Sequence, residues 1–174
     1  MQTEDVSRIN LEFGVVMLLY SKSELHRSWR VDMASKYILP ALLTKQYLIM
    51  KDSKGVPLGY ASWAYFDLQR EAQYIKDPHS ITIADWGCGD RLWFIDWVSP
   101  IDARITDEMY LHLKHQLFPN GVARSLRIKP GANGAKIKSY GGARVSIESR
   151  RVILSRYYAE LKEFVGDDDS KLFF

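Results

Sequence analysis

The chain has 174 residues, of which 47% are apolar and 26% are charged, and its formal net charge is +3. This composition is typical of a globular domain with its own core, and the single cysteine, Cys88, excludes an internal disulfide. We expect no secretory signal and no membrane span, because the most apolar early stretch, 13–20, is far shorter than the ~20 residues that cross a bilayer. The prediction is one cytoplasmic domain over residues 1–174 with an acidic tail at 166–174, which is a candidate for flexibility.

Apolar periodicity and turn residues predict helices and strands without an internal repeat or a linker. The helices are expected over about 11–21, 31–43, 106–117 and 145–165. The strands are expected over 46–51, 58–66, 91–99, 123–129 and 135–140, the first two as an antiparallel hairpin. Asn10 and Thr106 are suitable N-caps for the first and third helices, and Pro40 should interrupt the second. We therefore predict an α+β fold in which helices flank a mostly antiparallel or mixed central sheet.

One residue of the predicted strand 91–99 does not fit its apolar sequence. Alternation along the strand places Asp96 on the same face as Phe94 and Val98. An ionised carboxylate on a buried face is costly unless it is paired and hydrogen-bonded. Asp96 therefore requires a partner, which is either a set of backbone amides or a functional group.

His26 lies in the polar segment between the first two predicted helices. An imidazole has an ordinary pKa near ~6.5, so a histidine in such a turn can act as a general base at neutral pH. An aspartate in the sheet can orient such a base and stabilise its cation. Taken alone, the residues leave open both a surface histidine and a His26–Asp96 pair.

The other candidates for chemistry are weaker. His112 and His115 lie three residues apart on a predicted helix, but a catalytic zinc takes three protein ligands and no third one lies nearby. We therefore expect no metal site. Cys88 stands between glycines and could form an acyl thioester, although a glycine-rich turn before a strand needs no such role.

Positive charge is concentrated in residues 121–156, which contain nine lysines and arginines against one acid, Glu148. A stretch of this kind can attract an acidic partner by long-range steering. A solvated basic face without a partner is an alternative, and so is a nucleic-acid-binding module. The second alternative is disfavoured because Tyr140 and its neighbours offer too few aromatic rings for base stacking.

Four stretches resemble, in order, the lysine acyltransferases that activate RTX toxins. They are SELHRSW at 23–29, ASWAYFDL at 61–68, WGCGDRLWFIDWVSP at 86–100 and ARSLRIKPG at 123–131. In addition, YYAEL at 157–161 is similar to the last helix of the family. The resemblance thus runs through nearly the whole chain, and the GDRLWFIDW block is specific.

Carried over residue by residue, the resemblance implies that His26 is the catalytic histidine and Asp96 the catalytic aspartate. It implies supporting positions for Ser23, three residues before the histidine, and for Gly89, before the strand. A covalent route stays open in which Ser23, His26 or Cys88 briefly carries the acyl group.

The resemblance also implies a reaction and a fold. The reaction is transfer of a fatty acyl group from acyl carrier protein to internal lysines of an RTX protoxin, without a bound cofactor, on a fold similar to the GNAT acetyltransferases. GNAT enzymes that use CoA hold its pyrophosphate in a glycine-containing loop, and residues 99–104 at the corresponding junction contain no glycine. A carrier protein needs no such loop, and its acidic surface would suit Arg124, Arg127 and Lys129.

Two other functions stay open at this point: a CoA-dependent N-acetyltransferase of GNAT type and a basic nucleic-acid-binding module. The acyl chain, the toxin and its modified lysines cannot be read from the sequence. Whether the chain forms a homodimer is equally open.

Overall fold

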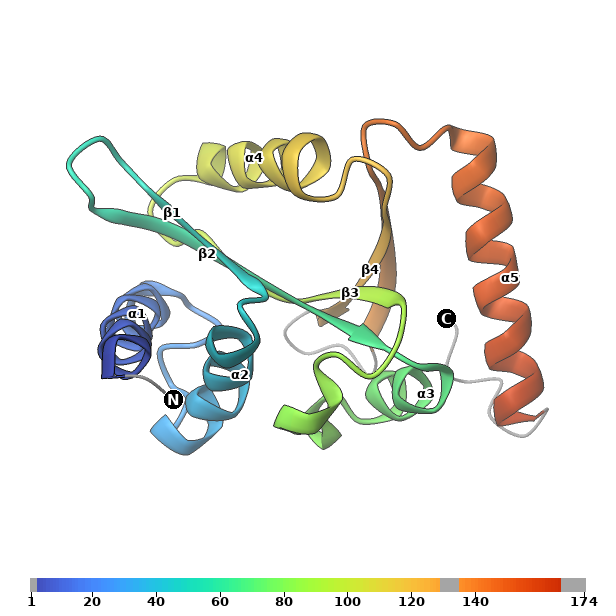
Figure 1. The fold of residues 1–174 in the computed structure, drawn as a ribbon, viewed down its shortest axis with the longest axis horizontal. Helices are drawn as coiled ribbons and strands as arrows, with labels where there is room; N and C mark the ends of the chain where they lie inside the picture. The colour runs from blue at the N-terminus through green and yellow to red at the C-terminus, as the bar shows by residue number, and fades with distance from the viewer. Residues whose placement is uncertain (1–2, 129–134, 167–174) are drawn as a thin grey trace. The chain divides into compact units, whose positions relative to one another are not determined.

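The computed structural model describes residues 3–128 and 135–166 (Figure 1). The chain divides into two compact units. The first unit consists of Met1–Trp63 and Ile95–Leu111, and the second of Ala64–Phe94 and His112–Phe174. The single-domain assignment made from the sequence stays a prediction, and the acidic tail falls outside the described residues from position 167 onward.

Helices and a mixed sheet make up both units (Figure 1). The helices are α1 (Thr3–Lys22), α2 (Val31–Thr44), α3 (Leu68–Lys76), α4 (Ala103–His112) and α5 (Ile147–Val165). The strands are β1 (Tyr47–Lys51), β2 (Pro57–Phe66), β3 (Arg91–Val98), β4 (Val122–Ile128) and β5 (Ala135–Gly141), in the order β1-β2-β3-β4-β5. The β1/β2 and β4/β5 pairs are antiparallel and the β3/β4 pair is parallel. The predicted α+β class is confirmed, and this mixed architecture is consistent with a GNAT-like fold.

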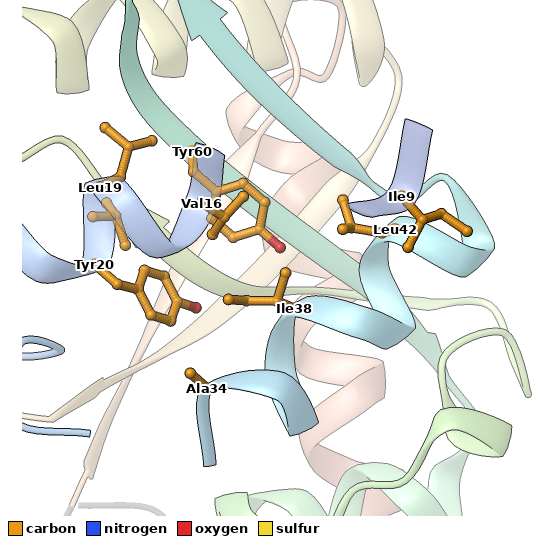
Figure 2. Close-up of a cluster of buried hydrophobic side chains, with 9 residues drawn as sticks. Ile9, Val16, Leu19, Tyr20, Ala34, Ile38, Leu42 and Tyr60 are labelled. Carbon is orange, nitrogen blue, oxygen red and sulfur yellow. The ribbon is translucent and has the colours of Figure 1, made fainter. Parts of the chain in front are cut away.

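The first unit has a core where α1 and α2 pack together beside Tyr60 of β2 (Figure 2). Val98 of β3 belongs to the same core. Its aliphatic members are fully or almost fully buried, and each contributes roughly 1.5–3 kcal/mol on leaving water. The larger ones, to which this range applies, are Ile9, Val16, Leu19, Ile38, Leu42 and Val98. This core fixes the last turn of α1, from which the chain enters the segment that contains His26.

Two predicted helix starts in the first unit are wrong, and so is the predicted interruption at Pro40. Helix α1 begins at Thr3, not after Asn10, because acidic residues in its first turn suit the positive end of the helix dipole. Helix α2 continues through Pro40, since burial of its inner face outweighs the lost backbone hydrogen bond. Helix α4 begins at Ala103, where the Asp102 carboxylate accepts the Arg104 N–H at 2.9 Å, so Thr106 lies inside the helix.

The second unit contains α3, β4, β5 and α5. Helix α3 is absent from the elements predicted from the sequence, although Asp67 is a typical N-cap whose side chain accepts the Arg70 N–H at 2.7 Å. The parallel β3/β4 pair is covered by side chains of α3 and α5, and Trp93 is fully buried there. The same region buries several charged groups.

Within residues 3–128 and 135–166, no helix has the length and apolar character needed to cross a bilayer. The cytoplasmic location expected from the sequence stays a prediction, and so does the oligomeric state.

Candidate active site

His26 and Asp96 lie together in the first unit. His26 belongs to a turn after α1 in which its backbone N–H donates to the Ser23 carbonyl at 3.2 Å, and Asp96 projects from β3. The His26 Nε2 atom is 3.3 Å from Asp96 Oδ1, and the histidine is only 4% exposed. The burial cost expected for Asp96 is therefore met in part by an imidazole.

Both ring nitrogens of His26 are engaged. The Ser23 hydroxyl lies 2.8 Å from Nδ1, on the edge of the ring opposite to Asp96. An ionised carboxylate only accepts hydrogen bonds, so a neutral His26 carries its proton on Nε2 and accepts from Ser23 at Nδ1. The half-buried Ser23 thereby connects the proton-accepting nitrogen of His26 to the surface.

Asp96 has two further hydrogen-bond donors. The Tyr20 hydroxyl donates to its Oδ2, and the Trp97 backbone N–H donates to its Oδ1 at 2.8 Å. These bonds stabilise the ionised carboxylate, whose side chain is 10% exposed. Burial and the nearby Asp96 charge together raise the pKa of Tyr20 well above its usual range, so this phenol is a hydrogen-bond donor at any working pH.

Aromatic rings enclose the imidazole. The Tyr20 ring stacks on His26 with centroids 4.3 Å apart and planes 26° apart, while Trp29 contacts it edge-on at 4.6 Å. Tyr20 lies in the buried cluster between α1 and α2, with its hydroxyl visible in Figure 2. Such a shell excludes water from the ring and strengthens the electrostatic interaction between His26 and Asp96.

Gly89, the other position implied by the resemblance, belongs to the second unit, where a requirement of packing accounts for it. A Cβ atom at this position would lie 2.2 Å from the backbone of Phe66 and Asp67, and the Gly89 N–H donates to the Tyr65 carbonyl at 3.2 Å. Only glycine allows the two segments to approach this closely.

The three predicted carrier contacts have different outcomes. Arg124 is 0% exposed and pairs with Glu71, so the prediction that it meets a partner at the surface is wrong. Its position in β4 turns the side chain toward α3 and α5, whereas its neighbour Arg127 is exposed. Lys129 lies outside the described residues.

The structure adds no support for a metal site or for Cys88 as a reactive group. Among the residues that the structure describes, no cluster of three or more His, Cys, Asp or Glu could hold a metal ion. Cys88 is exposed, and its Sγ lies 3.8 Å from the Tyr65 carbonyl.

Comparison with known proteins agrees with these observations. The sequence model of the RTX toxin acyltransferase family matches residues 5–141. The chain belongs to this family. The matched range includes all of Ser23, His26 and Asp96, and also Tyr20 and Trp29 around them.

Relatives of this family member are protein-lysine acyltransferases. It is 35% identical to a protein-lysine myristoyltransferase of Kingella kingae over 91% of this chain and 93% of the relative. It is 36% identical to a leukotoxin-activating lysine-acyltransferase of Aggregatibacter actinomycetemcomitans, covering 85% and 86%. A protein-lysine palmitoyltransferase of Bordetella bronchiseptica is 34% identical, covering 85% and 79%.

The second unit of this acyltransferase also buries a carboxylate, Glu71, which is 0% exposed. Its oxygens accept from the guanidiniums of Arg91 and Arg124 and, at 2.7 Å, from the Trp93 indole N–H. Burial raises the pKa of Glu71, while the two guanidiniums favour its charged form. Glu160 pairs with Arg91, so this buried network carries two charges of each sign.

Sequence reasoning missed two residues of the site, Tyr20 and Trp29. In the sequence, Tyr20 is one of several apolar residues spaced along the inner face of a helix. Its spacing does not distinguish a tyrosine that only packs in the core from one that donates a hydrogen bond to a strand aspartate. Trp29 follows His26 by three residues, a spacing that places both in one turn, and this was the available signal.

Proposed function

We propose that this protein transfers a fatty acyl group from acyl carrier protein to lysine side chains of an RTX protoxin, with His26 as the general base. The observation that carries the proposal is the Ser23–His26–Asp96 series, held at 2.8 Å and 3.3 Å inside an aromatic shell. Its setting is a family whose named members acylate lysine or activate toxins through lysine acylation.

The chemical obstacle is the proton on the lysine. A lysine with an ordinary pKa of ~10.4 is ~3.4 units above neutral pH, which corresponds to roughly 4.6 kcal/mol for the free amine form. The amine nitrogen must lose a further proton as it attacks, and a base that accepts that proton in the transition state contributes about 10²–10⁴-fold to the rate. Nδ1 of His26 is suited to this task because Nε2 already faces the Asp96 carboxylate.

Ser23 supplies a route for the proton. The lysine ammonium first releases one proton to solvent. As the neutral amine attacks, its nitrogen gives a second proton to the Ser23 oxygen while the Ser23 proton passes to Nδ1 of His26 over the 2.8 Å contact. The amine nitrogen attacks the thioester carbonyl, the new C–N bond forms, and the C–S bond breaks. The departing thiolate of the carrier then takes the proton that His26 has gained, which returns the imidazole to its starting state.

Asp96 stabilises the cation that His26 becomes when it accepts a proton. The imidazolium would form in a site that is almost completely buried, where an unpaired charge is strongly unfavourable. The carboxylate 3.3 Å from Nε2 stabilises this charge and keeps Nδ1 as the nitrogen that gains and loses the proton.

Residues at the start of α4 support a carrier protein, not CoA, as the donor. The Asp102 carboxylate accepts the Arg104 N–H at 2.9 Å and pairs with the Arg104 guanidinium at 2.6 Å. These bonds to Arg104 hold the pKa of Asp102 below its usual value. A pyrophosphate at this helix N-terminus would therefore have to compete with Asp102 for the Arg104 backbone N–H, whereas phosphopantetheine on a carrier brings no pyrophosphate.

The face of β4 and β5 that bears Arg127 supports an acidic partner. Arg127 lies directly opposite Lys136, and Lys138 follows two residues later on the same face, all three exposed. Like charges opposite each other destabilise a sheet by a few tenths of a kcal/mol, roughly, and an acidic protein surface would remove this cost. We therefore assign carrier docking to this face in place of Arg124.

The donor can be tested with purified protein and the RTX protoxin from the same genome. Palmitoyl or myristoyl groups would be offered either on acyl carrier protein or on CoA, and the protoxin would be analysed by intact mass and peptide mapping. We expect acylated lysines with the carrier-bound donor and a much lower rate with the CoA thioester. Turnover of acetyl-CoA with small amines, together with no transfer from the carrier, would instead identify a CoA-dependent acetyltransferase.

The docking face can be tested with Arg127→Glu combined with Lys136→Glu. We expect the KM for acyl carrier protein to rise about tenfold with little change in kcat, and the effect to shrink in high salt. Arg144→Glu combined with Arg151→Glu is the matched control, because both arginines are exposed in the same unit and the net charge changes equally. Equal effects of the two variants would mean that only net charge matters.

A further inference from the structure

We propose that Tyr20 is a positioning residue that holds Asp96 and His26 at a fixed distance and orientation. Its hydrogen bond to Asp96 also weakens the attraction between the carboxylate and a protonated His26. The inference rests on the proposed function of His26 as a base. It concerns a side chain that takes no part in the proton route through Ser23.

Tyr20 contacts both members of the pair with two different parts of its side chain. The hydroxyl donates to Asp96 Oδ2, and the ring lies on the His26 imidazole at 4.3 Å. Because the residue is 2% exposed and packed in the core between α1 and α2 (Figure 2), its ring has little room to turn. One rigid group therefore fixes the distance between an aspartate on β3 and a histidine in a turn.

The two oxygens of Asp96 have separate partners. Oδ1 faces His26 and the Trp97 N–H, while Oδ2 accepts from Tyr20. A hydrogen bond to Oδ2 draws negative charge away from Oδ1 and so weakens the attraction between Asp96 and an imidazolium. A base that held its proton too strongly could not return it to the leaving thiolate. The weaker attraction between Asp96 and the imidazolium therefore favours the step in which His26 protonates the thiolate.

The titratable groups around Tyr20 in the first unit are a carboxylate, an imidazole and two phenols. The titratable or charged neighbours of Tyr20 in the first unit are Asp96 on β3, Tyr37 on α2 and Tyr60 on β2, besides His26 itself. A free phenol ionises near pH ~10, far from the working range. Burial raises the pKa of Tyr60 above that value.

The test is Tyr20→Phe, which keeps the ring and removes the hydroxyl. We expect kcat for protoxin acylation to fall about tenfold with KM unchanged, because the pair loses its register but the substrate contacts stay. The acid limb of the pH–kcat profile should move to higher pH by about one unit, since an unshared Asp96 charge holds the imidazole proton more tightly.

Tyr60→Phe is the matched control, because Tyr60 is a fully buried tyrosine of the same core with its ring centroid 6.4 Å from that of Tyr20. It should leave the pH profile in place even if the melting temperature falls. The inference is overturned if Tyr20→Phe has the wild-type pH profile and kcat, or if Tyr60→Phe shifts the profile equally. Asp96→Asn in the same assay separates this outcome from failure of the proposed function, which would leave that variant active.

Discussion

Each unit of this acyltransferase buries a carboxylate among aromatic rings, but the two carboxylates have different partners. Glu71 in the second unit accepts from two guanidiniums and an indole, none of which changes its protonation near neutral pH. Asp96 in the first unit faces an imidazole, a group that can both donate and accept protons, and that imidazole is linked to the half-buried Ser23. The two carboxylates are similarly buried and differ in the chemistry of their partners, so the proposed role of Asp96 depends on the imidazole that it faces.

The largest effect should come from Asp96→Asn. The amide cannot stabilise an imidazolium and can turn its NH₂ toward His26, which favours the wrong tautomer, so we expect acylation to fall by about 10³–10⁴-fold. Initial rates of protoxin acylation, followed by mass spectrometry, measure this. Asp32→Asn is the control, because Asp32 is an exposed aspartate of the same unit paired with Arg30, and it should retain nearly full activity.

Glu71→Gln should show the opposite pattern. Removing the charge leaves Arg91 and Arg124 buried beside a neutral amide, and we expect a loss of about 3–5 kcal/mol in the free energy of unfolding. Activity per folded molecule should change little. Glu160→Gln, at the more exposed end of the same network, should cost much less. If Glu71→Gln abolished acylation in a fully folded protein, the contrast between the two carboxylates would fail.

The two carboxylates also differ in how well the sequence predicts them. Asp96 stands out in an apolar strand because a lone carboxylate there demands a partner, and the family motif then indicates His26. The contact between them depends on how a turn after α1 meets β3, which no local pattern specifies. The sequence does not mark Glu71 in the same way, because a glutamate in a short amphipathic helix is expected on the solvent face.

The fold was predictable to a similar degree. Strands with strong branched and aromatic runs, such as β3, agree with their predicted ranges to within a residue. Besides the missed helix α3, the errors are two helix starts and the expected break at Pro40, where Asn10, Thr106 and Pro40 were given local roles that the structure does not bear out. Arg124 was assigned to the surface because a basic stretch does not show which of its side chains alternate inward.

Gly89→Ala tests whether the glycine implied by the resemblance serves packing in the second unit. Its new methyl group would meet backbone atoms that cannot move aside easily, so we expect a loss of roughly 1–3 kcal/mol in unfolding free energy. Gly87→Ala is the control, because a Cβ there has nothing within 4 Å. Denaturant titration of both variants measures the difference, and equal stabilities would contradict the packing explanation.

The smallest effect concerns alkaline pH. Burial raises the pKa of Tyr20 and of Tyr60, so both phenols ionise more readily in the unfolded chain. Their contribution to stability is therefore complete below pH ~10 and is lost progressively as the pH rises above that value. Denaturation midpoints between pH 8 and pH ~11.5 should fall with pH, and fall less steeply in Tyr20→Phe. A midpoint that stayed constant over this range would contradict the assignment.

The most direct test of the central claim is the acylation rate of His26→Ala, measured by intact mass of the protoxin with saturating acyl carrier protein donor. We predict that the variant folds with a nearly unchanged circular dichroism spectrum and that its rate falls by about 10²–10⁴-fold, with partial recovery on addition of imidazole. A folded His26→Ala protein that acylates the protoxin at the wild-type rate would contradict the claim that this histidine is the base.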